Sequence, residues 1–221
     1  MGYYPVFFDL RGKLCLVVGG GRIAERKVAS LLDSGARVLV VSPELTPVLE
    51  GLKARGAISH RSGKYQQSDL AGVFLVICAV NDKNINQNIA ADCNENNLPV
   101  NVVDQPDLCS FFVPAVMRRG DLTLAVSTGG KSPLLARRMK EELENRYGDH
   151  YGEFLDMLAA HRQVVIRQVK DESKKKEILE KMVTDEVLDL LRDNLMEQVK
   201  ERLRSAYHHG GAKPQNRAGD G

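Results

Sequence analysis

A glycine-rich loop has residue types and spacing that suit the binding of a dinucleotide: Gly19, Gly20, Gly21, Arg22, Ile23 and Ala24. In the pattern Gly-x-Gly-x-x-Gly/Ala, the first glycine permits a sharp turn from a strand into a helix, and the second lets a pyrophosphate approach the backbone. The small third residue lets the helix pack closely on the strand, and the N-terminus of that helix attracts the anion. The alternative is a tight turn in a domain that binds no ligand.

The ribose of such a nucleotide is expected at the end of the next strand, where Val41, Ser42, Pro43 and Glu44 follow one another. The acidic residue that commonly ends this strand is missing, but Ser42 can bond to a ribose hydroxyl and Glu44 can reach it. No Arg or Lys follows immediately to bind a 2′-phosphate, which favours NAD over NADP as cofactor. Another stretch at the carboxyl edge of the sheet is expected to complete the cofactor site: Ala79, Val80 and Asn81.

Asp104 follows the apolar stretch 99–103 and therefore places a carboxylate at the carboxyl end of a strand, where ligands bind in open α/β sheets. A carboxylate in this position can take a proton from a substrate carbon or nitrogen as hydride leaves to NAD. The alternative is a loop aspartate that caps the next turn, especially because Gln105 and Pro106 come directly after it. The residues alone leave both interpretations open.

A second polar turn precedes a basic helix, and its residues are Ser127, Thr128, Gly129, Gly130 and Lys131. It resembles the end of a phosphate-binding Gly-x-x-x-x-Gly-Lys-Ser loop, but the first glycine of that pattern would fall on Ala125. The turn is better interpreted as an anion-binding nest at a helix N-terminus, with Arg137 on the helix that follows. Such a surface suits a substrate with several carboxylates. The alternative is a solvated basic helix face.

Strands and helices must alternate along the first hundred residues to position these groups. Short apolar runs predict strands at 13–18, 37–41, 73–80 and 99–103, and helical spacing predicts helices at 24–33, 45–55 and 84–96. Alternation of this kind implies parallel pairing with right-handed crossovers. We therefore predict an α/β fold with a Rossmann-like, doubly wound parallel sheet over residues 1–112.

The alternation of strands and helices ends after Asp104. Strand-like runs at 111–117 and 122–127 predict a hairpin, and a helix at 132–147 begins with Ser132 as N-cap and Pro133 in the first turn. This hairpin-and-helix segment is assigned to residues 113–148. A helical C-terminal domain over 149–205 is expected to contain three helices, at 151–170, 172–182 and 185–204, and residues 206–221 are expected to form a disordered tail.

Composition limits the class of protein. The 221 residues are 43% hydrophobic, which supports a real core, and a net charge of +2 gives no reason to expect nucleic acid or a membrane surface as partner. No stretch is long and apolar enough to cross a bilayer, and the first residues do not form a secretory signal. The four cysteines lack metal-ligand spacing, so no metal site is expected. Their interpretation as free buried thiols indicates a cytoplasmic location.

Taken together, the chain resembles the precorrin-2 dehydrogenase family of sirohaem synthesis, which also forms the amino-terminal module of fused bacterial sirohaem synthases. The resemblance is close over residues 1–150 and only general in the helical remainder. The matching stretches are residues 4–7, Val17 to Gly21 with Ala24 to Lys27, Asn101 to Asp104, Ser110 to Ala115, and Ala125 to Pro133 with Leu135 to Arg137.

The resemblance implies an activity and roles for particular residues. The substrate would be precorrin-2, a tetrapyrrole with eight carboxylates, and NAD would accept hydride as sirohydrochlorin forms, in sirohaem or cobalamin biosynthesis. Asp104 matches the family's aspartate proposed as general base and, in bifunctional members, as part of metal insertion. The family's nucleotide contacts fall on Arg22, Ile23, Pro43 and Glu44. Family members are homodimers that exchange the segment after Asp104.

Two departures from the family bear on these implications. Thr128 stands where many fused enzymes have Ser, so the pair Ser127-Thr128 keeps a hydroxyl but not the same one. Only 74 residues follow Tyr147, too few for a methyltransferase module, so the chain is expected to be a stand-alone dehydrogenase. Insertion of Fe²⁺ or Co²⁺ into sirohydrochlorin stays open, as do two alternatives: a non-catalytic NAD-binding sensor and an enzyme that only chelates.

Overall fold

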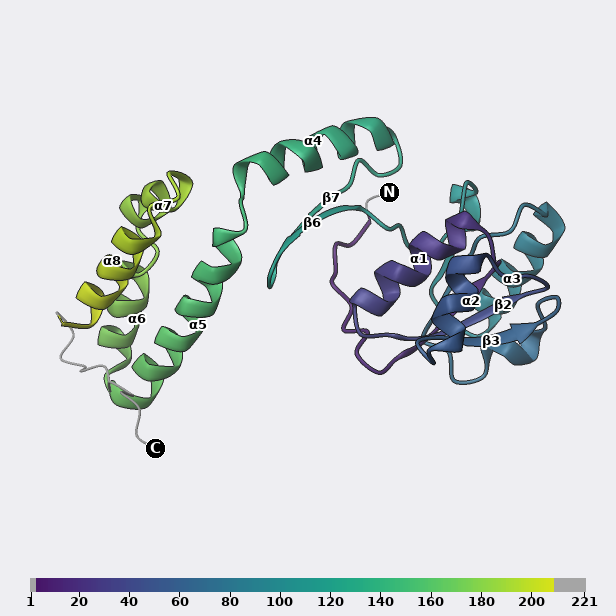
Figure 1. Cartoon of the computed structure of the whole chain (residues 1–221), viewed down its shortest axis with the longest axis horizontal. Helices are drawn as coiled ribbons and strands as arrows, with labels where there is room; N and C mark the ends of the chain where they lie inside the picture. The colour runs from purple at the N-terminus through teal and green to yellow at the C-terminus, as the bar shows by residue number, and fades with distance from the viewer. Residues whose placement is uncertain (1–2, 209–221) are drawn as a thin grey trace. The chain divides into compact units, whose positions relative to one another are not determined.

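The computed structural model describes residues 3–208 and divides into two compact units, one ending at Val113 and the other beginning at Pro114 (Figure 1). Each unit has its own hydrophobic core.

A five-stranded parallel sheet forms the centre of the first unit, with the strand order β3-β2-β1-β4-β5. Its strands are β1 (Leu14–Val18), β2 (Arg37–Ser42), β3 (Ser59–Ser62), β4 (Leu75–Cys78) and β5 (Val100–Val102). The chain adds strands on one side of β1 and then crosses to the other side at β4. This order confirms the doubly wound parallel sheet and puts the topological switch point between β1 and β4, where such folds bind ligands.

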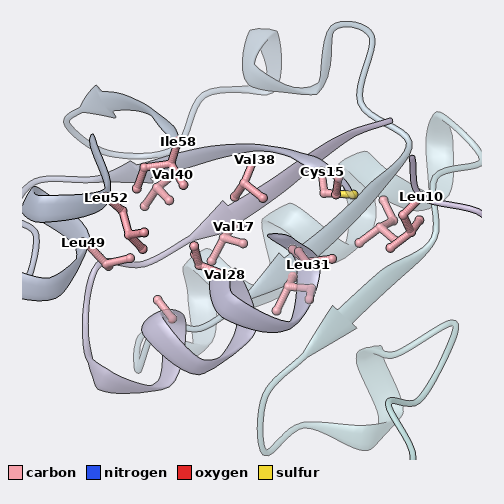
Figure 2. Packing of buried hydrophobic residues seen from close by; sticks show 14 residues of the cluster. Leu10, Cys15, Val17, Val28, Leu31, Val38, Val40, Leu49, Leu52 and Ile58 are labelled. Carbon is pink, nitrogen blue, oxygen red and sulfur yellow. The ribbon is translucent and has the colours of Figure 1, made fainter. Parts of the chain in front are cut away.

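Helices cover both faces of this sheet. They are α1 (Arg22–Asp33), α2 (Pro47–Ala54) and α3 (Lys83–Glu95), with short 3₁₀ turns η1 (Gln67–Leu70) and η2 (Pro106–Leu108). Alternate strand residues point to opposite faces, so Val17 packs with Val28 and Leu31 of α1, whereas Leu16 belongs to the core on the α3 face. Figure 2 shows the first of these cores, in which side chains of α1 and α2 meet those of β1 and β2.

The strand β3 was not predicted, because its sequence Ser59-His60-Arg61-Ser62 has no apolar residue. It lies at the edge of the sheet and pairs only with β2. An edge strand is not buried on both faces, so it does not need an apolar sequence. The strand predicted at 73–80 is shorter in the structure, since only Leu75–Cys78 pairs with its neighbours.

The second unit begins with the antiparallel hairpin of β6 (Ala115–Arg119) and β7 (Leu122–Val126), followed by α4 (Pro133–Arg146). The predicted hairpin is confirmed, although its first strand starts at Ala115 rather than at Phe111. The predicted start of the helix is confirmed as well, since the Ser132 hydroxyl accepts a hydrogen bond from the Leu135 amide and Pro133 occupies the first turn.

Arg119 ties the hairpin to the end of α4. Its guanidinium donates to the carbonyl oxygens of Tyr147 at 3.0 Å and Glu144 at 3.3 Å, and it lies 3.2 Å from the Asp149 carboxylate. These carbonyls at the C-terminus of a helix lack partners within the helix and carry partial negative charge. The arginine therefore satisfies the end of α4 and fixes where the next helix begins.

In the described part of the second unit, up to residue 208, α4 is followed by four helices: α5 (His150–Gln168), α6 (Glu172–Lys181), α7 (Asp185–Arg192) and α8 (Met196–His208). They pack side by side (Figure 1) around a core that includes Met182, Leu191, Val199 and Leu203. Within residues 3–208, no helix is both long enough and apolar enough to cross a membrane.

Two expectations about the carboxyl-terminal helices were wrong. The single helix expected over 185–204 is two helices, because the chain turns through Asn194 in the left-handed conformation, with φ 56°. The first residues of the expected tail, 206–208, belong to α8, which continues to His208, and Ala206 is buried in the helical core. Residues 209–221, the rest of that expected tail, lie outside the described residues.

Leu203 tests how strongly the helical core depends on α8, because its side chain is fully buried there. We expect Leu203→Ala to lower the free energy of unfolding by about 2–5 kcal/mol through lost burial and a residual cavity. Urea unfolding followed by far-ultraviolet circular dichroism measures this change. The exposed neighbour Glu201 gives the control, since Glu201→Ala is expected to shift stability by no more than about 0.5 kcal/mol. Equal effects of the two variants would contradict the assigned packing of α8.

Candidate nucleotide and substrate site

The first two glycines of the loop after β1 are required by close backbone contacts. Gly19 has φ +119°, a conformation that favours glycine, and a side chain there would lie 2.5 Å from the Ala79 carbonyl oxygen. A side chain on Gly20 would overlap the carbonyl oxygen of Glu44. The loop is therefore held between the chain that leaves β4 and the chain that leaves β2.

Gly21 differs from its neighbours because the space where a side chain would lie is empty. No heavy atom lies within 4 Å of its ideal Cβ position, and the residue is exposed at the N-cap of α1. The first amides of an α-helix have no partner within the helix and carry partial positive charge. An anion can approach the backbone here, which is the geometry that the sequence pattern predicts.

The chain after β2 is ordered by Ser42, whose side chain is buried. Its hydroxyl donates to the Glu44 carbonyl oxygen at 2.7 Å, while its own carbonyl oxygen accepts from the Gly63 amide at 3.1 Å. The Thr46 amide donates to the Gly20 carbonyl oxygen at 3.0 Å, which joins this turn to the glycine loop. Pro43 and Glu44 remain exposed beyond the end of the strand. The Ser42 hydroxyl, which also lies 3.4 Å from His60 Nε2, thus shapes the turn.

The chain after β4 lies on the other side of the glycine loop. Ala79 donates its amide to the Val18 carbonyl oxygen at 2.8 Å, and Asn81 is exposed. The buried side chain of Asn86 donates to the Val80 carbonyl oxygen at 3.2 Å and accepts from the Cys78 thiol at 2.9 Å. Asn86 was missed by the sequence analysis, although it shares the inward face of α3 with Ile89 and so follows the helical period.

Asp104 lies two residues beyond the end of β5, at the same carboxyl edge of the sheet as the glycine loop. It is exposed and adopts φ 59°, a left-handed conformation that Asp tolerates better than most side chains. The next turn, η2, has Gln105 as its N-cap. Among the described residues, the Asp104 carboxylate makes no hydrogen bond to that turn, so the geometry gives no support to the capping alternative.

Lys27 is a half-buried cation near Asp104 that the sequence analysis did not assign to the site. Burial lowers the pKa of Lys27, Arg26 lowers it further, and the charges of Cys109 and Asp104 act in the opposite direction. Its ammonium therefore lies within electrostatic range of the Asp104 carboxylate. A lysine here can attract an acidic group of a ligand.

In the second unit, the turn after β7 is ordered by its own side chains. The Ser127 hydroxyl accepts from the Gly129 amide at 3.2 Å, and the Thr128 hydroxyl accepts from the Ser132 amide at 3.1 Å. Gly129 and Gly130 both have positive φ, as a nest conformation requires of at least one residue. Both hydroxyls can still donate a hydrogen bond, so the turn can meet an anion with hydroxyl groups.

The basic face of α4 is partly neutralised. Arg137 is exposed and pairs with Glu141 at 2.9 Å, and Lys140 pairs with Glu144 at 2.8 Å. The Arg137 pair is exposed, and such a pair contributes little energy and is easily rearranged, whereas Lys140 and Glu144 are half-buried. Arg137 is therefore available to a ligand with stronger negative charge than a single glutamate.

The cysteines are free, and three of them are buried. Burial raises the pKa of Cys15 and of Cys78 to about 11, and that of Cys93 to about 12. Such thiols stay protonated at neutral pH and are poor nucleophiles and metal ligands. Within residues 3–208, no group of three or more His, Cys, Asp or Glu side chains could hold a metal ion.

Comparisons with known proteins identify the family of the chain. A family model for NAD(P)-binding domains matches residues 6–115, and a model for the central part of sirohaem biosynthesis proteins matches residues 119–146. The solved structure of SirC, a precorrin-2 dehydrogenase, superposes with a TM-score of 0.74 at 32% identity and covers 90% of this chain and 100% of SirC. The chain belongs to the precorrin-2 dehydrogenase family.

Curated relatives of this family are longer proteins. The siroheme synthase of Thioalkalivibrio sulfidiphilus is 38% identical over 210 residues, which are 95% of this chain and 43% of that protein. The siroheme synthase of Saccharophagus degradans is 43% identical over 163 residues, which are 74% of this chain and 36% of that protein. The chain thus spans less than half the length of these curated relatives.

Gly21 offers a test of the loop that separates ligand binding from folding. We expect Gly21→Asp to leave the melting temperature nearly unchanged, because the added side chain points into empty space. We expect the same change to weaken NAD binding by about tenfold or more, since a carboxylate would take the place of the pyrophosphate and repel it. Isothermal titration calorimetry measures the dissociation constant.

Gly21→Ala is the matched control, since it adds a methyl group without charge and should weaken NAD binding less. Unchanged NAD affinity of a well-folded Gly21→Asp variant would contradict the assignment of this loop to the pyrophosphate.

Proposed function

We propose that this chain catalyses the NAD-dependent dehydrogenation of precorrin-2 to sirohydrochlorin. The observation that carries the proposal is the meeting of two features at one edge of the sheet: an open glycine loop after β1 and an exposed carboxylate after β5. They lie on opposite sides of the β1–β4 switch point, which is where a dinucleotide and its reaction partner meet in this architecture. Membership of the precorrin-2 dehydrogenase family supports the same reaction.

The residues at this edge fit a dinucleotide. The empty space at Gly21 and the free first amides of α1 suit a pyrophosphate, with Arg22 and Ile23 in the first turn. Ser42, Pro43 and Glu44 are proposed to hold the ribose of the adenosine half. The stretch Ala79 to Asn81 is proposed to flank the other half. When bound, NAD supplies the acceptor for the hydride that leaves the substrate.

Asp104 is proposed to accept the proton that leaves precorrin-2 when the tetrapyrrole is oxidised. Loss of one hydride and one proton balances the reaction, so a base beside the reacting carbon or nitrogen is needed. The Asp104 carboxylate is exposed to a ligand. The Lys27 ammonium lies within electrostatic range of this carboxylate.

Precorrin-2 carries many carboxylates, and the basic groups of the second unit are proposed to bind them. The Ser127–Lys131 turn offers hydroxyl donors beside an ammonium group, and Arg137 offers a planar guanidinium that can bind a carboxylate through two hydrogen bonds.

A homodimer is the proposed assembly, and α4 supplies its support. Leu134, Leu135 and Met139 are 66%, 50% and 43% exposed on this helix, although their side chains are apolar. Neighbouring apolar groups on one exposed helix mark an interaction surface more often than single ones do. A second copy of the chain is the partner that the family resemblance implies.

We also propose a cytoplasmic location, which the four free thiols support because such thiols persist in a reducing compartment. Fe²⁺ or Co²⁺ is proposed as a further substrate in a chelation step. Adding either metal to the protein with sirohydrochlorin, and following the absorbance of the tetrapyrrole, tests that step separately from dehydrogenation.

Asp104→Asn tests the proposed base with little disturbance of the backbone, because Asn also tolerates the left-handed conformation. We expect dehydrogenation of precorrin-2 to slow by roughly 10²- to 10⁴-fold, which is the usual contribution of a general base. NAD affinity should stay within about threefold, since Asp104 lies outside the glycine loop. The appearance of sirohydrochlorin absorbance without added metal measures the rate.

The exposed Asp107, three residues further on, provides the control, because Asp107→Asn removes the same charge from the same loop. If both variants kept full activity, Asp104 would not be the base. If the unmodified protein bound NAD but left precorrin-2 unchanged, the proposed reaction would be wrong and a non-catalytic NAD-binding role would replace it.

Leu134→Glu tests the proposed dimer surface. We expect it to shift the protein toward the monomer in analytical ultracentrifugation at micromolar concentration, since burying an unpaired carboxylate is costly. Asn145→Glu adds the same charge to an exposed position near the other end of α4 and should leave the dimer intact. Sedimentation of the unmodified chain as a monomer would rule out the dimer.

A further inference from the structure

An ion pair between a buried carboxylate and a partly exposed guanidinium lies at the edge strand next to β2 and takes no part in the roles assigned so far. It joins Arg61, at the carboxyl end of the edge strand β3, to Asp69 of η1. Arg61 Nε donates to Asp69 Oδ1 at 2.5 Å, and Arg61 Nη2 donates to Asp69 Oδ2. The pair is bidentate, which is the strongest arrangement of a guanidinium with a carboxylate.

The surroundings hold both members of the pair in place. The Asp69 side chain is only 5% exposed, and its Oδ2 also accepts from the Gln66 amide at 2.8 Å. Arg61 Nη2 donates to the Lys64 carbonyl oxygen at 2.8 Å. The guanidinium is therefore largely committed to partners within the protein, and its charge is neutralised by a buried carboxylate.

Arg61 lies on the strand beside the one whose end is proposed to hold the ribose. It pairs in register with Val41 of β2, one residue before the strand ends at Ser42. Its guanidinium packs on the chain that leaves β3, because Nη1 lies 3.4 Å from the position that a side chain on Gly63 would take. The turns after the two strands are also joined directly, because the Gly63 amide donates to the Ser42 carbonyl oxygen and the Ser62 hydroxyl to that of Pro43.

The charge at this edge decides between the two nicotinamide dinucleotides, which differ only by a 2′-phosphate on the adenosine ribose. Recognition of that phosphate needs an uncommitted cation, most often an arginine. Glu44 instead presents a carboxylate there, which accepts a hydrogen bond from a free 2′-hydroxyl and repels a phosphate. A guanidinium already neutralised by Asp69 does not offset this repulsion.

We propose that Asp69 is a specificity-determining residue: by holding Arg61 in this ion pair, it keeps the ribose site selective for NAD over NADP. The inference rests on the proposed binding of NAD at this edge. In this proposal Asp69 does not contact the cofactor and acts only through Arg61.

The test is Asp69→Asn, which keeps an oxygen for the Gln66 amide and removes the charge that holds Arg61. By calorimetry, the unmodified chain should bind NAD more tightly than NADP. In the variant, NADP binding should tighten by about tenfold or more, the value of one new charge-assisted hydrogen bond, while NAD binding stays within about twofold. Steady-state KM values for the two cofactors should shift in the same ratio.

The double variant Arg61→Ala/Asp69→Asn is the matched control, because it removes the released guanidinium and leaves no unpaired buried charge. The gain in NADP affinity should vanish in it. A gain that persists without Arg61, or no gain in a well-folded Asp69→Asn variant, would overturn the proposal while leaving NAD binding in place. Failure of the unmodified chain to bind either dinucleotide would instead reject the cofactor site itself.

Loss of one partner from a buried pair can be destabilising, so melting temperatures accompany each titration. If Asp69→Asn does not fold, Asp69→Ser replaces it, since a serine hydroxyl can also accept from the Gln66 amide. The same gain in NADP affinity is expected, and its absence in the folded variant would again overturn the proposal.

Discussion

The close approach of the glycine loop to the ends of β2 and β4 is the constraint on which the rest of the nucleotide-binding unit depends. Gly19 lies against the Ala79 carbonyl and Gly20 against that of Glu44, so backbone meets backbone on both sides. Directly after these two contacts, α1 begins at Arg22 with the exposed Gly21 as its N-cap. Side chains are excluded at Gly19 and Gly20, whereas the space at Gly21 is open. Together these two facts set the position of the proposed pyrophosphate site.

Residues with a strong local signal were predictable from the sequence. The alternation of apolar strands with helices predicted the doubly wound parallel sheet. Ser132 and Pro133 correctly predicted the start of α4. The glycine pattern distinguished the loop because each of its positions has a separate steric reason. Asp104 could be located at a strand end, although its left-handed conformation could not be inferred from residue type.

What the sequence did not reveal depends on contacts between distant segments. The edge strand β3 is polar throughout and becomes a strand only because β2 offers its unpaired edge. The break in the last helix follows from Asn194, which helical periodicity alone does not distinguish from a residue inside a helix. Lys27 acquires its environment from the chain after β5, more than 70 residues away by number, and so carries no local signal.

The same edge strand explains why cofactor selectivity need not reside in the residues that meet the cofactor. The end of β2 carries Glu44 and no cation, and these residues alone predict NAD as cofactor. The structure adds that a cation is present one strand away and is held by Asp69. Selectivity then depends on two carboxylates. Glu44 repels a 2′-phosphate, and Asp69 keeps the Arg61 guanidinium from neutralising that phosphate. Because the Asp69 carboxylate is buried, its effect on Arg61 is less screened by salt than the repulsion by the exposed Glu44.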